Sequence, residues 1–391
     1  MPDQYKIVLT GGGSGGHITP IQAIAGELKQ LKPSVNIIYI GQIGDKLGDI
    51  PANDQHIDAV YSVRAGKFRR YHGEGFKQIF DLATLFKNMR DALFVVVGIV
   101  QSFRLLRQLR PNVIFVKGGF VGVPVGLAAA ILNIPYITHD SDAIPGLANR
   151  IISRWAKLHT VALPAEVYPY PQSKTVTTGI PLQPQFQPVD NKSNKLYRQQ
   201  LNIPLTAKVL FIIGGGLGSQ RINEAVAETV PHLINEFKDL YVIHGVGRAN
   251  EDYMKQLYAD KLTTKEQTRL SIFGYKTDVF RYSGAADLII MRAGATNIAE
   301  FAVQAKACII IPSPFLTGGH QLKNAKILAD KQAAVIMNEV NVEADPNRLA
   351  KQVSNLLNDG AGRQSLAKNL STFAKPNATH DLAEIILKTA N

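Results

Sequence analysis

The chain contains the same local pattern twice, at positions about 200 residues apart. In the first copy, the apolar run 6–10 leads into GGGSGGH (11–17) and then into a helical pattern. In the second copy, the run 208–213 leads into GGGLGS (214–219), and a helical pattern follows over 221–230. A buried strand that turns through glycines into a helix is the opening unit of a doubly wound α/β domain. Two copies therefore predict two such domains.

Further apolar runs alternate with helical patterns in both halves of the chain. They lie at 36–40, 113–116 and 136–138 in the first half, and at 240–243, 288–290 and 307–311 in the second. Continuous apolar strands between helices are typical of parallel sheets that are covered on both faces. We therefore predict an α/β chain of two doubly wound, Rossmann-like domains facing each other across a cleft. The polar, proline-rich segment 181–204 is the predicted linker.

Length and composition agree with this organisation. The 391 residues suffice for two or three domains, and 46% of them are hydrophobic. The one cysteine, Cys308, excludes an intrachain disulfide and a multi-cysteine zinc site. The N-terminus carries no signal peptide pattern, and the longest uninterrupted apolar run, 92–100, is far shorter than the roughly 20 residues of a spanning helix. We expect a soluble, cytoplasmic chain.

The net charge of +12 is unevenly distributed. Between residues 60 and 110 there are ten Lys and Arg but only three Asp and Glu. Part of this stretch combines apolar residues at helical spacing with bases beside them: Phe76, Lys77, Ile79, Phe80, Phe86, Lys87 and Arg90. Such a helix can lie in an anionic membrane interface, although the apolar stripe could also be ordinary core. We expect an anionic membrane surface as a partner and, because no recognised binding module occurs, no nucleic acid.

The two glycine loops indicate chemistry with phosphate. Backbone amides at a helix N-terminus can bind a phosphate, although a glycine turn can also serve only tight packing. Neither loop is a P-loop, since Gly-Lys-Ser/Thr is absent, and the run 38–42 lacks the acidic residue with which a dehydrogenase holds a ribose. His17 ends the first loop, where the helix dipole favours the neutral imidazole that a general base requires. The alternative is a capping or packing histidine.

Six blocks carry a resemblance to a known family. They are GGGSGGHITP (11–20), KGGFVGVPVGLAA (117–129), HDSDAIPGLANR (139–150), GGGLGSQRINEA (214–225), RAGATNIAE (292–300) and HQLKNA (320–325). In their order and spacing the chain resembles the MurG family of GT-B glycosyltransferases, from about residue 5 to the C-terminus.

The resemblance implies an inverting glycosyltransferase without a metal cofactor. It would move N-acetylglucosamine from its UDP donor to the muramyl 4-hydroxyl of lipid I, giving lipid II for peptidoglycan. The domain 1–182 would bind acceptor and membrane, and the domain 183–391 the UDP-sugar, with the last helix able to pack back on the first domain. The enzyme would be peripheral on the cytoplasmic face of the cell membrane, with other cell-wall synthesis proteins as further partners. A relative with another UDP-sugar or lipid acceptor, or a degenerate binding protein of low activity, remains an alternative.

The resemblance also assigns site residues. It implies that His17 is the base and that Asp140 belongs to the catalytic set. It implies substrate contacts for Ser14, Gly15, Gly16, Asn149, Gln183, Gly214, Gly215, Gly216, Gly218, Lys276, Ala295, Glu300, His320 and Gln321. Among them, Glu300 would hold the donor ribose, Gln321 the sugar hydroxyls, and the backbone near Lys276 the uracil.

The chain departs from the family pattern at several positions. Gln183 stands where an arginine is usual, so a contact to the donor diphosphate loses its charge there. Gly216 replaces a loop serine, and Phe120 a tyrosine. Asp140 and Asp142 stand where the family often has Glu and Asn, which makes the acceptor side more acidic.

Overall fold

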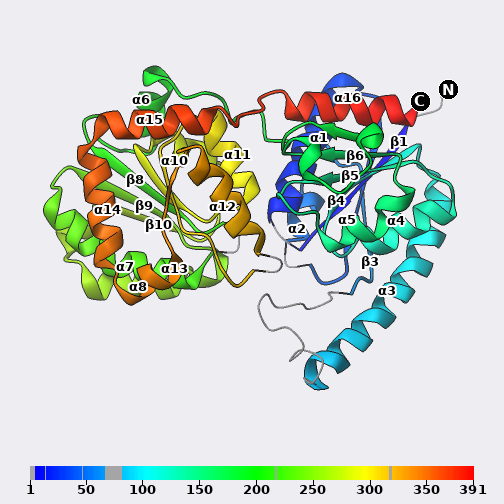
Figure 1. Cartoon of the computed structure of the whole chain (residues 1–391), viewed down its shortest axis with the longest axis horizontal. Coiled ribbons are helices and arrows are strands. Elements are labelled where there is room, and N and C mark those ends of the chain that lie inside the picture. Colours follow the sequence, from blue (N-terminus) through cyan, green and yellow to red (C-terminus); the bar gives the residue numbers. More distant parts are fainter. Residues whose placement is uncertain (1–4, 14, 46, 67–81, 216–217, 317–318) are drawn as a thin grey trace. The chain divides into compact units, whose positions relative to one another are not determined.

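A computed structural model describes residues 5–13, 15–45, 47–66, 82–215, 218–316 and 319–391. The chain divides into two compact units (Figure 1). Unit 1 comprises Met1–Pro184, Phe315–His320 and Lys375–Asn391, and unit 2 comprises Gln185–Pro314 and Gln321–Ala374. Each unit has its own parallel sheet, so the prediction of two doubly wound α/β domains is confirmed.

Unit 1 has a parallel sheet in the order β3-β2-β1-β4-β5-β6-β7. Its strands are β1 (Lys6–Gly11), β2 (Asn36–Gln42), β3 (Ala59–Val63), β4 (Val113–Gly118), β5 (Tyr136–Asp140), β6 (Leu158–Val161) and β7 (Thr175–Thr177). Its α-helices are α1 (Gly15–Leu31), α2 (Asp49–Ala52), α3 (Leu82–Leu109), α4 (Gly122–Ile131), α5 (Leu147–Ile152) and α16 (Ala378–Ala390). The 3-10 turns η2 (Ser153–Trp155), η3 (Ala165–Val167) and η4 (Gln172–Lys174) lie between the last strands.

Unit 2 repeats this plan with the order β10-β9-β8-β11-β12-β13. Its strands are β8 (Lys208–Ile213), β9 (Leu240–Gly245), β10 (Leu270–Phe273), β11 (Leu288–Met291), β12 (Cys308–Ile310) and β13 (Val335–Ile336). Its helices are α6 (Asn191–Gln200), α7 (Gln220–Glu236), α8 (Glu251–Lys261), α9 (Thr264–Gln267), α10 (Val279–Ala285), α11 (Ala295–Val303), α12 (His320–Asp330), α13 (Glu339–Ala344), α14 (Asn347–Asn358) and α15 (Gly360–Ser371). The 3-10 turn η5 (Arg248–Asn250) precedes α8.

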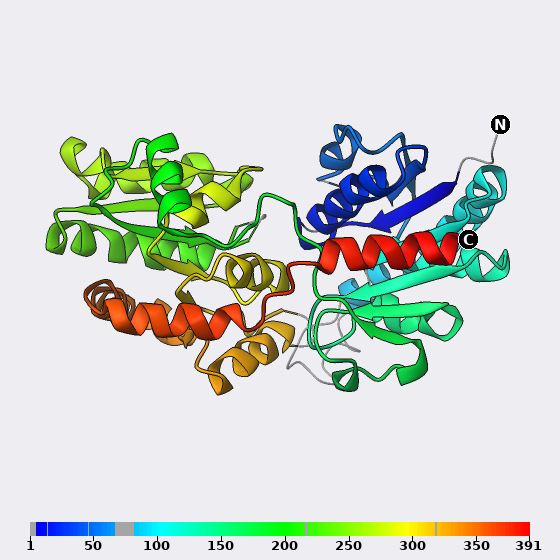
Figure 2. The same ribbon diagram turned by 90° about the horizontal axis from the view of Figure 1, so that it is seen from above.

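The central strand of unit 1 shows why its runs are apolar throughout. Successive side chains of a strand point to opposite faces of the sheet. Ile7 and Leu9 accordingly join the core that α1 and α16 cover, whereas Val8 joins the core that α3 and α4 cover. The last helix of the chain, α16, thus lies against α1 and completes the core of the unit in which the chain begins (Figure 2).

The segment 181–204 is not a linker throughout, which corrects the sequence-based prediction. Residues Asn191–Gln200 form α6, and the side chains of Asp190 and Ser193 form a capping box at its start. The helix is polar, so apolar periodicity could not reveal it; a buried arginine, Arg198, holds it to the unit instead.

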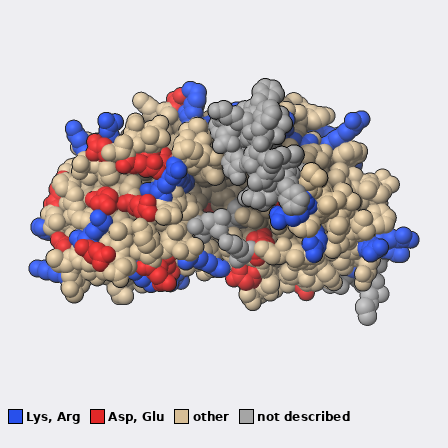
Figure 3. Space-filling view, turned by 90° about the horizontal axis from the view of Figure 1, so that it is seen from below, with Lys and Arg blue, Asp and Glu red and all other residues tan. Residues whose placement is uncertain are grey.

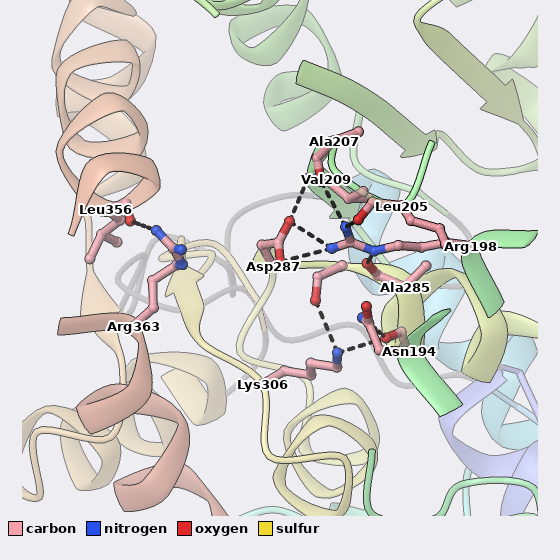
Figure 4. A network of polar contacts seen from close by, with 12 residues as sticks. Asn194, Arg198, Leu205, Ala207, Val209, Ala285, Asp287, Lys306, Leu356 and Arg363 are labelled. Atoms are coloured by element: carbon pink, nitrogen blue, oxygen red, sulfur yellow. Dashed lines mark hydrogen bonds and ion pairs between the residues drawn. The ribbon is translucent and has the colours of Figure 1, made fainter. Parts of the chain in front are cut away.

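Arg198 is the centre of a buried polar network in unit 2 (Figure 4). Its guanidinium donates to both carboxylate oxygens of Asp287, at 2.8 and 2.9 Å, and to backbone carbonyls at Leu205, Ala207 and Ala285. Asp287 also accepts the backbone N–H of Val209 at 2.7 Å. The ion pair therefore fixes α6 to the starts of β8 and β11.

The helix α3 departs most from expectation. Its last turns pack on α4, and Leu106 is fully buried. Nearer the start of α3, apolar side chains at helical spacing form an exposed stripe: Met89, Leu93, Val96, Val97 and Val100. Within the described residues, one segment, Met89–Leu109, is long and apolar enough by length and composition to cross a membrane. The count of uninterrupted apolar residues did not single out this segment, because scattered arginines interrupt the run without preventing a high mean hydropathy.

Of the predicted membrane residues, only Arg90 has a described side chain. Phe76, Lys77, Ile79 and Phe80 lie outside the described residues, as do the side chains of Phe86 and Lys87 within α3. Arg90 is described: it is half-exposed, pairs with Asp91 at 3.1 Å, and lies near the ring of Phe94. In the right-hand part of Figure 3, which is unit 1, Lys and Arg are more frequent than Asp and Glu on the described surface.

Candidate active site

His17 lies in the first turn of α1, directly after the first glycine loop. The residue is partly buried, and its Nδ1 atom is wholly buried and makes no hydrogen bond among the described residues. Burial, and secondly the charge of Lys117, lower the pKa of His17 to about 3. The imidazole is therefore neutral at pH 7, as a general base requires.

The first glycine loop is held by a carboxylate that was not among the predicted site residues. Asp45, in the turn after β2, accepts the backbone N–H of Gly13 at 2.9 Å and that of Leu47 at 3.1 Å. The hydroxyl of Tyr39 donates to the carbonyl of Gly11. At least one amide of this loop is thus already bound to a carboxylate within the unit.

Several polar side chains lie at or just after the carboxyl ends of β4 and β5, and one of them, Asn149, approaches Gly118 as His17 does. Lys117 donates from Nζ to the hydroxyl of Ser141 at 2.6 Å. Asn149 is buried and donates to the carbonyl of His139 at 2.9 Å. Asp140 is buried as well: one carboxylate oxygen accepts the hydroxyl of Tyr170 at 2.7 Å, and the other the backbone N–H of Gly146 at 3.0 Å.

These contacts have a clear consequence for Asp140. Desolvation raises the pKa of its carboxyl, while the bonds from Tyr170 and Gly146 act in the opposite direction. Both oxygens are engaged within the unit, so the observed role of Asp140 is to hold the segment that follows β5. Its catalytic role remains a prediction.

The second glycine loop joins β8 to α7 in unit 2. A Cβ on Gly218 would overlap the carbonyl of Val246, and its φ of +75° also requires glycine. Gly215, with φ of +93°, faces open space, and Gly214 packs against the backbone of Ser219. Among the described residues, no side chain caps α7, whose N-cap residue is Ser219. Amides at this N-terminus can therefore accept an anionic group.

Ser219 is held by a buried ion pair. Arg292, just beyond β11, donates to the hydroxyl of Ser219 at 2.6 Å and to the carbonyl of Ile311 at 3.1 Å. The same guanidinium pairs with Glu339, which is 2% exposed. The motif RAGATNIAE thus contributes a residue that fixes the start of α7, which the sequence did not indicate.

Two predicted donor contacts lie on helices that begin at the same edge of the sheet. Glu300, on α11, is partly buried, and desolvation raises the pKa of its carboxyl to about 8. Gln321, on α12, is buried, and its amide oxygen accepts the backbone N–H of Ser313 at 2.9 Å. That bond leaves the amide NH₂ of Gln321 to face a ligand as a donor.

The remaining predicted residues are placed as follows. Gly15 and Gly16 open α1, Ala295 opens α11, and His320 opens α12. Lys276 is exposed in the segment after β10, and Gln183 is partly buried in irregular chain before α6. Ser14 and Gly216 lie outside the described residues. In the part of the chain that the structure describes, no three His, Cys, Asp or Glu side chains form a group able to hold a metal ion.

Comparison with known proteins identifies the class. Residues 7–160 match the glycosyltransferase family 28 N-terminal domain, and residues 209–382 match the glycosyltransferase family 28 C-terminal domain. The two matches together span most of the chain. This protein belongs to glycosyltransferase family 28.

Full-length relatives narrow the assignment within this family. A protein from Natranaerobius thermophilus is 31% identical over 97% of this chain and 99% of its own length, and one from Flavobacterium psychrophilum is 30% identical over 99% and 98%. Both are named UDP-N-acetylglucosamine–N-acetylmuramyl-(pentapeptide) pyrophosphoryl-undecaprenol N-acetylglucosamine transferase. The crystal structure of MurG from Acinetobacter baumannii is 26% identical, with a TM-score of 0.69, and covers 98% of this chain and 99% of that one. The resemblance to the MurG family and the GT-B fold are thereby confirmed.

Proposed function

We propose that this chain transfers N-acetylglucosamine from UDP-N-acetylglucosamine to the 4-hydroxyl of the muramyl sugar of lipid I, which gives lipid II for peptidoglycan. The observation that carries the proposal is its similarity, over 97% or more of the chain, to relatives that bear this transferase name. The presence of His17, Glu300 and Gln321 in the expected motifs supports it.

The described residues suggest how the steps would be divided. His17, a neutral imidazole, would take the proton of the acceptor hydroxyl as its oxygen attacks the anomeric carbon. The bond from that carbon to the UDP oxygen breaks, and the anomeric configuration inverts. Negative charge then grows on the leaving diphosphate, which the amides at the start of α7 would stabilise.

A direct assay tests this proposal. Purified protein, UDP-N-acetylglucosamine and lipid I in detergent should release UDP and form a disaccharide lipid that mass spectrometry identifies. UDP release without lipid II would indicate another acceptor, and donor binding without turnover would favour a degenerate protein. Metal-free catalysis also remains a prediction, which retention of activity in EDTA would support.

The donor site gives a first testable prediction. Glu300→Ala should weaken UDP binding by about 1.5–3 kcal/mol, because a carboxylate that accepts two ribose hydroxyls makes charge-assisted hydrogen bonds. Since burial raises the pKa of Glu300 to about 8, the carboxyl is mostly protonated at pH 7 and must lose its proton to accept both hydroxyls. UDP affinity should therefore rise with pH up to about 8, by at most about tenfold per unit. Calorimetry at several pH values measures both effects.

Glu300→Gln is the matched control for this pH dependence. It preserves the shape of the side chain and leaves the titration of UDP itself unchanged, so only the share due to Glu300 should disappear. An unchanged UDP affinity in Glu300→Ala would contradict the placement of the ribose at α11.

We further propose that the enzyme docks on the membrane as a peripheral protein, on the cytoplasmic face where its lipid-anchored acceptor is presented. The exposed stripe on α3, Met89, Leu93, Val96, Val97 and Val100, follows one face of a helix whose surroundings are rich in bases. Apolar insertion together with attraction to anionic lipid is the usual basis of such docking.

Vesicle binding tests this docking. The double change Leu93→Glu and Val96→Glu should weaken binding to phosphatidylglycerol vesicles, measured by co-sedimentation, by about 100-fold or more. Each apolar side chain that is inserted into the lipid contributes about 1.5–3 kcal/mol to the binding free energy. Parent binding should also decrease as salt increases. Val340→Glu, at an apolar residue of unit 2 that is also more than half exposed, is the control and should bind as the parent does. Equal sedimentation of the double variant and the parent would exclude α3 as the docking surface.

A further inference from the structure

A buried histidine, His244, lies near the end of β9 in unit 2 and takes no part in the proposed steps. Two other buried side chains contact its ring, Asn223 on α7 and Tyr258 on α8. Nε2 of His244 lies 3.2 Å from Oδ1 of Asn223, and Nδ1 lies 2.9 Å from the hydroxyl oxygen of Tyr258. Burying a polar ring is costly unless its polar atoms are hydrogen-bonded, and here both ring nitrogens have partners.

The direction of each of these hydrogen bonds can be assigned. Nδ2 of Asn223 donates to the backbone carbonyl of Val246 at 2.8 Å. A carbonyl can only accept, so the amide cannot be turned round, and its Oδ1 atom faces His244 as an acceptor. Nε2 of His244 therefore carries a proton. Burial lowers the pKa of His244 to about 3, so the imidazole is neutral at pH 7, and its bare Nδ1 accepts the hydroxyl of Tyr258.

The carbonyl of Val246, at the end of this chain of bonds, is held from two sides. Besides Nδ2 of Asn223, Nδ2 of Asn250 in η5 donates to it, at 2.9 Å. Both lone pairs of the carbonyl oxygen are thus engaged. The backbone N–H of Val246 donates to the carbonyl of Phe273 at 2.9 Å, which continues the pairing of β9 with β10. Val246 is therefore fixed relative to both strands, to η5 and to the start of α7.

This fixed carbonyl lies against the second glycine loop. A Cβ at Gly218 would lie 2.1 Å from the oxygen of Val246, so only a glycine fits against it. The N–H of Gly218 donates to the carbonyl of Gly215 at 2.9 Å, which closes a turn. One residue on, the carbonyl of Ser219 accepts the N–H of Asn223 at 2.9 Å and begins α7. The end of the loop and the first turn of the helix are thus both fitted to one carbonyl oxygen.

His244 supplies the proton that Oδ1 of Asn223 accepts. Without it a buried acceptor would lack a donor, which favours movement of the Asn223 side chain away from Val246. Turning the amide round would not help, since Oδ1 of Asn223 would then face the carbonyl oxygen of Val246, another acceptor. The Val246 carbonyl would be held less firmly against Gly218. Loop amides that must be ordered when an anion binds give lower affinity than amides already in place.

We propose that His244 is a positioning residue for the sugar donor: through Asn223 it keeps the Val246 carbonyl against Gly218, so that the amides at the start of α7 are in place for the diphosphate. The proposal rests on the proposed function, since it takes the donor from there. It assigns to His244 the phosphate part of the ligand and not the uracil or the ribose, for which Lys276 and Glu300 are the predicted contacts. A change at His244 should therefore affect only ligands that carry the diphosphate.

Binding of UDP and of uridine tests this division, because uridine has the base and the ribose but no phosphate. His244→Leu, of similar size but without a donor, should weaken UDP binding by about tenfold or more in calorimetry and leave uridine binding, measured by NMR titration, unchanged. His244→Gln should recover most of the UDP affinity, since its amide nitrogen lies as many bonds from Cβ as Nε2 of histidine does and can donate to Asn223. An unchanged UDP affinity in folded His244→Leu, or an equal loss for uridine, would overturn the proposal.

Tyr258→Phe is the matched control. It removes the hydroxyl on the other side of the same buried imidazole, so it should lower stability but leave the bond to Asn223 and the affinity for UDP intact. A loss of UDP affinity as large as that in His244→Leu would mean that stability alone governs binding, and the proposal would fail.

A measurement on the parent covers the case in which His244→Leu does not fold. In the full chain labelled with ¹⁵N-histidine, NMR at pH 7 should show His244 protonated at Nε2 alone; a proton on Nδ1 would contradict the assigned bonds and overturn the proposal. None of these measurements involves the acceptor. If the parent binds UDP but forms no lipid II, the proposed function fails while the variants still decide the role of His244, whereas a parent that binds no UDP would overturn both.

Discussion

His17→Ala should reduce turnover by roughly 10²-fold or more, with little change in the affinity for UDP-N-acetylglucosamine. The imidazole is neutral at pH 7, and its ring lies at the start of α1. Removing it would leave the acceptor hydroxyl without the proposed group to take its proton, whereas the predicted donor-binding residues of unit 2 are untouched. Steady-state UDP release measures turnover, and calorimetry with the donor measures binding.

His17→Gln separates chemistry from packing. Glutamine fills much of the same volume and can form hydrogen bonds, but it cannot act as a base. A capping or packing role would therefore be largely restored in this variant, and a catalytic role would not. Recovery of more than about a tenth of parental turnover in His17→Gln would remove His17 from the mechanism.

Arg198→Met should lower the free energy of unfolding of unit 2 by about 3 kcal/mol. The change leaves the carboxylate of Asp287 without its bidentate partner and three backbone carbonyls without a donor. Asp287 is 29% exposed, so we expect the lower end of the range for a broken buried ion pair. Urea unfolding with an unchanged m value measures the difference.

The surface pair of Arg281 and Asp278 provides the control. Its atoms are 3.6 Å apart, and both side chains are substantially exposed, so Arg281→Met should cost less than about 1 kcal/mol. Equal losses in Arg281→Met and Arg198→Met would mean that the buried network does not hold α6 in place.

The central strands and the loop histidine could be predicted from sequence because their signals are local. The largely apolar runs that became β1, β4, β8 and β11 are buried on both faces, as in a parallel sheet between helices. The edge strand β3 was missed, since Val60 and Tyr61 remain half-exposed and the run is short. The glycines likewise placed His17 at a helix start because strand, loop and helix are contiguous.

The contacts that complete the site could not be predicted, because they join residues far apart in the sequence. Asp45 binds the first glycine loop across 32 positions, and Arg292 binds Ser219 across 73. The periodicity of apolar residues along the sequence does not indicate which distant residues pair. Lys117 was visible in its motif, but only its burial and its bond to Ser141 distinguish it from an ordinary surface lysine.

The place of α16 has a consequence for the order in which the protein can mature on the ribosome. Leu382 and Ile386 are fully buried against β1 and α1, and Thr379 exchanges hydrogen bonds with Leu182. The first half of the chain is synthesised long before these residues, so the sheet face that α1 and α16 cover together has only α1 on it while unit 2 is made. Domains usually fold as they emerge, N-terminal first. Here the unit that is translated first is completed last. Until α16 has been synthesised, the nascent chain exposes an apolar surface to which a chaperone can bind.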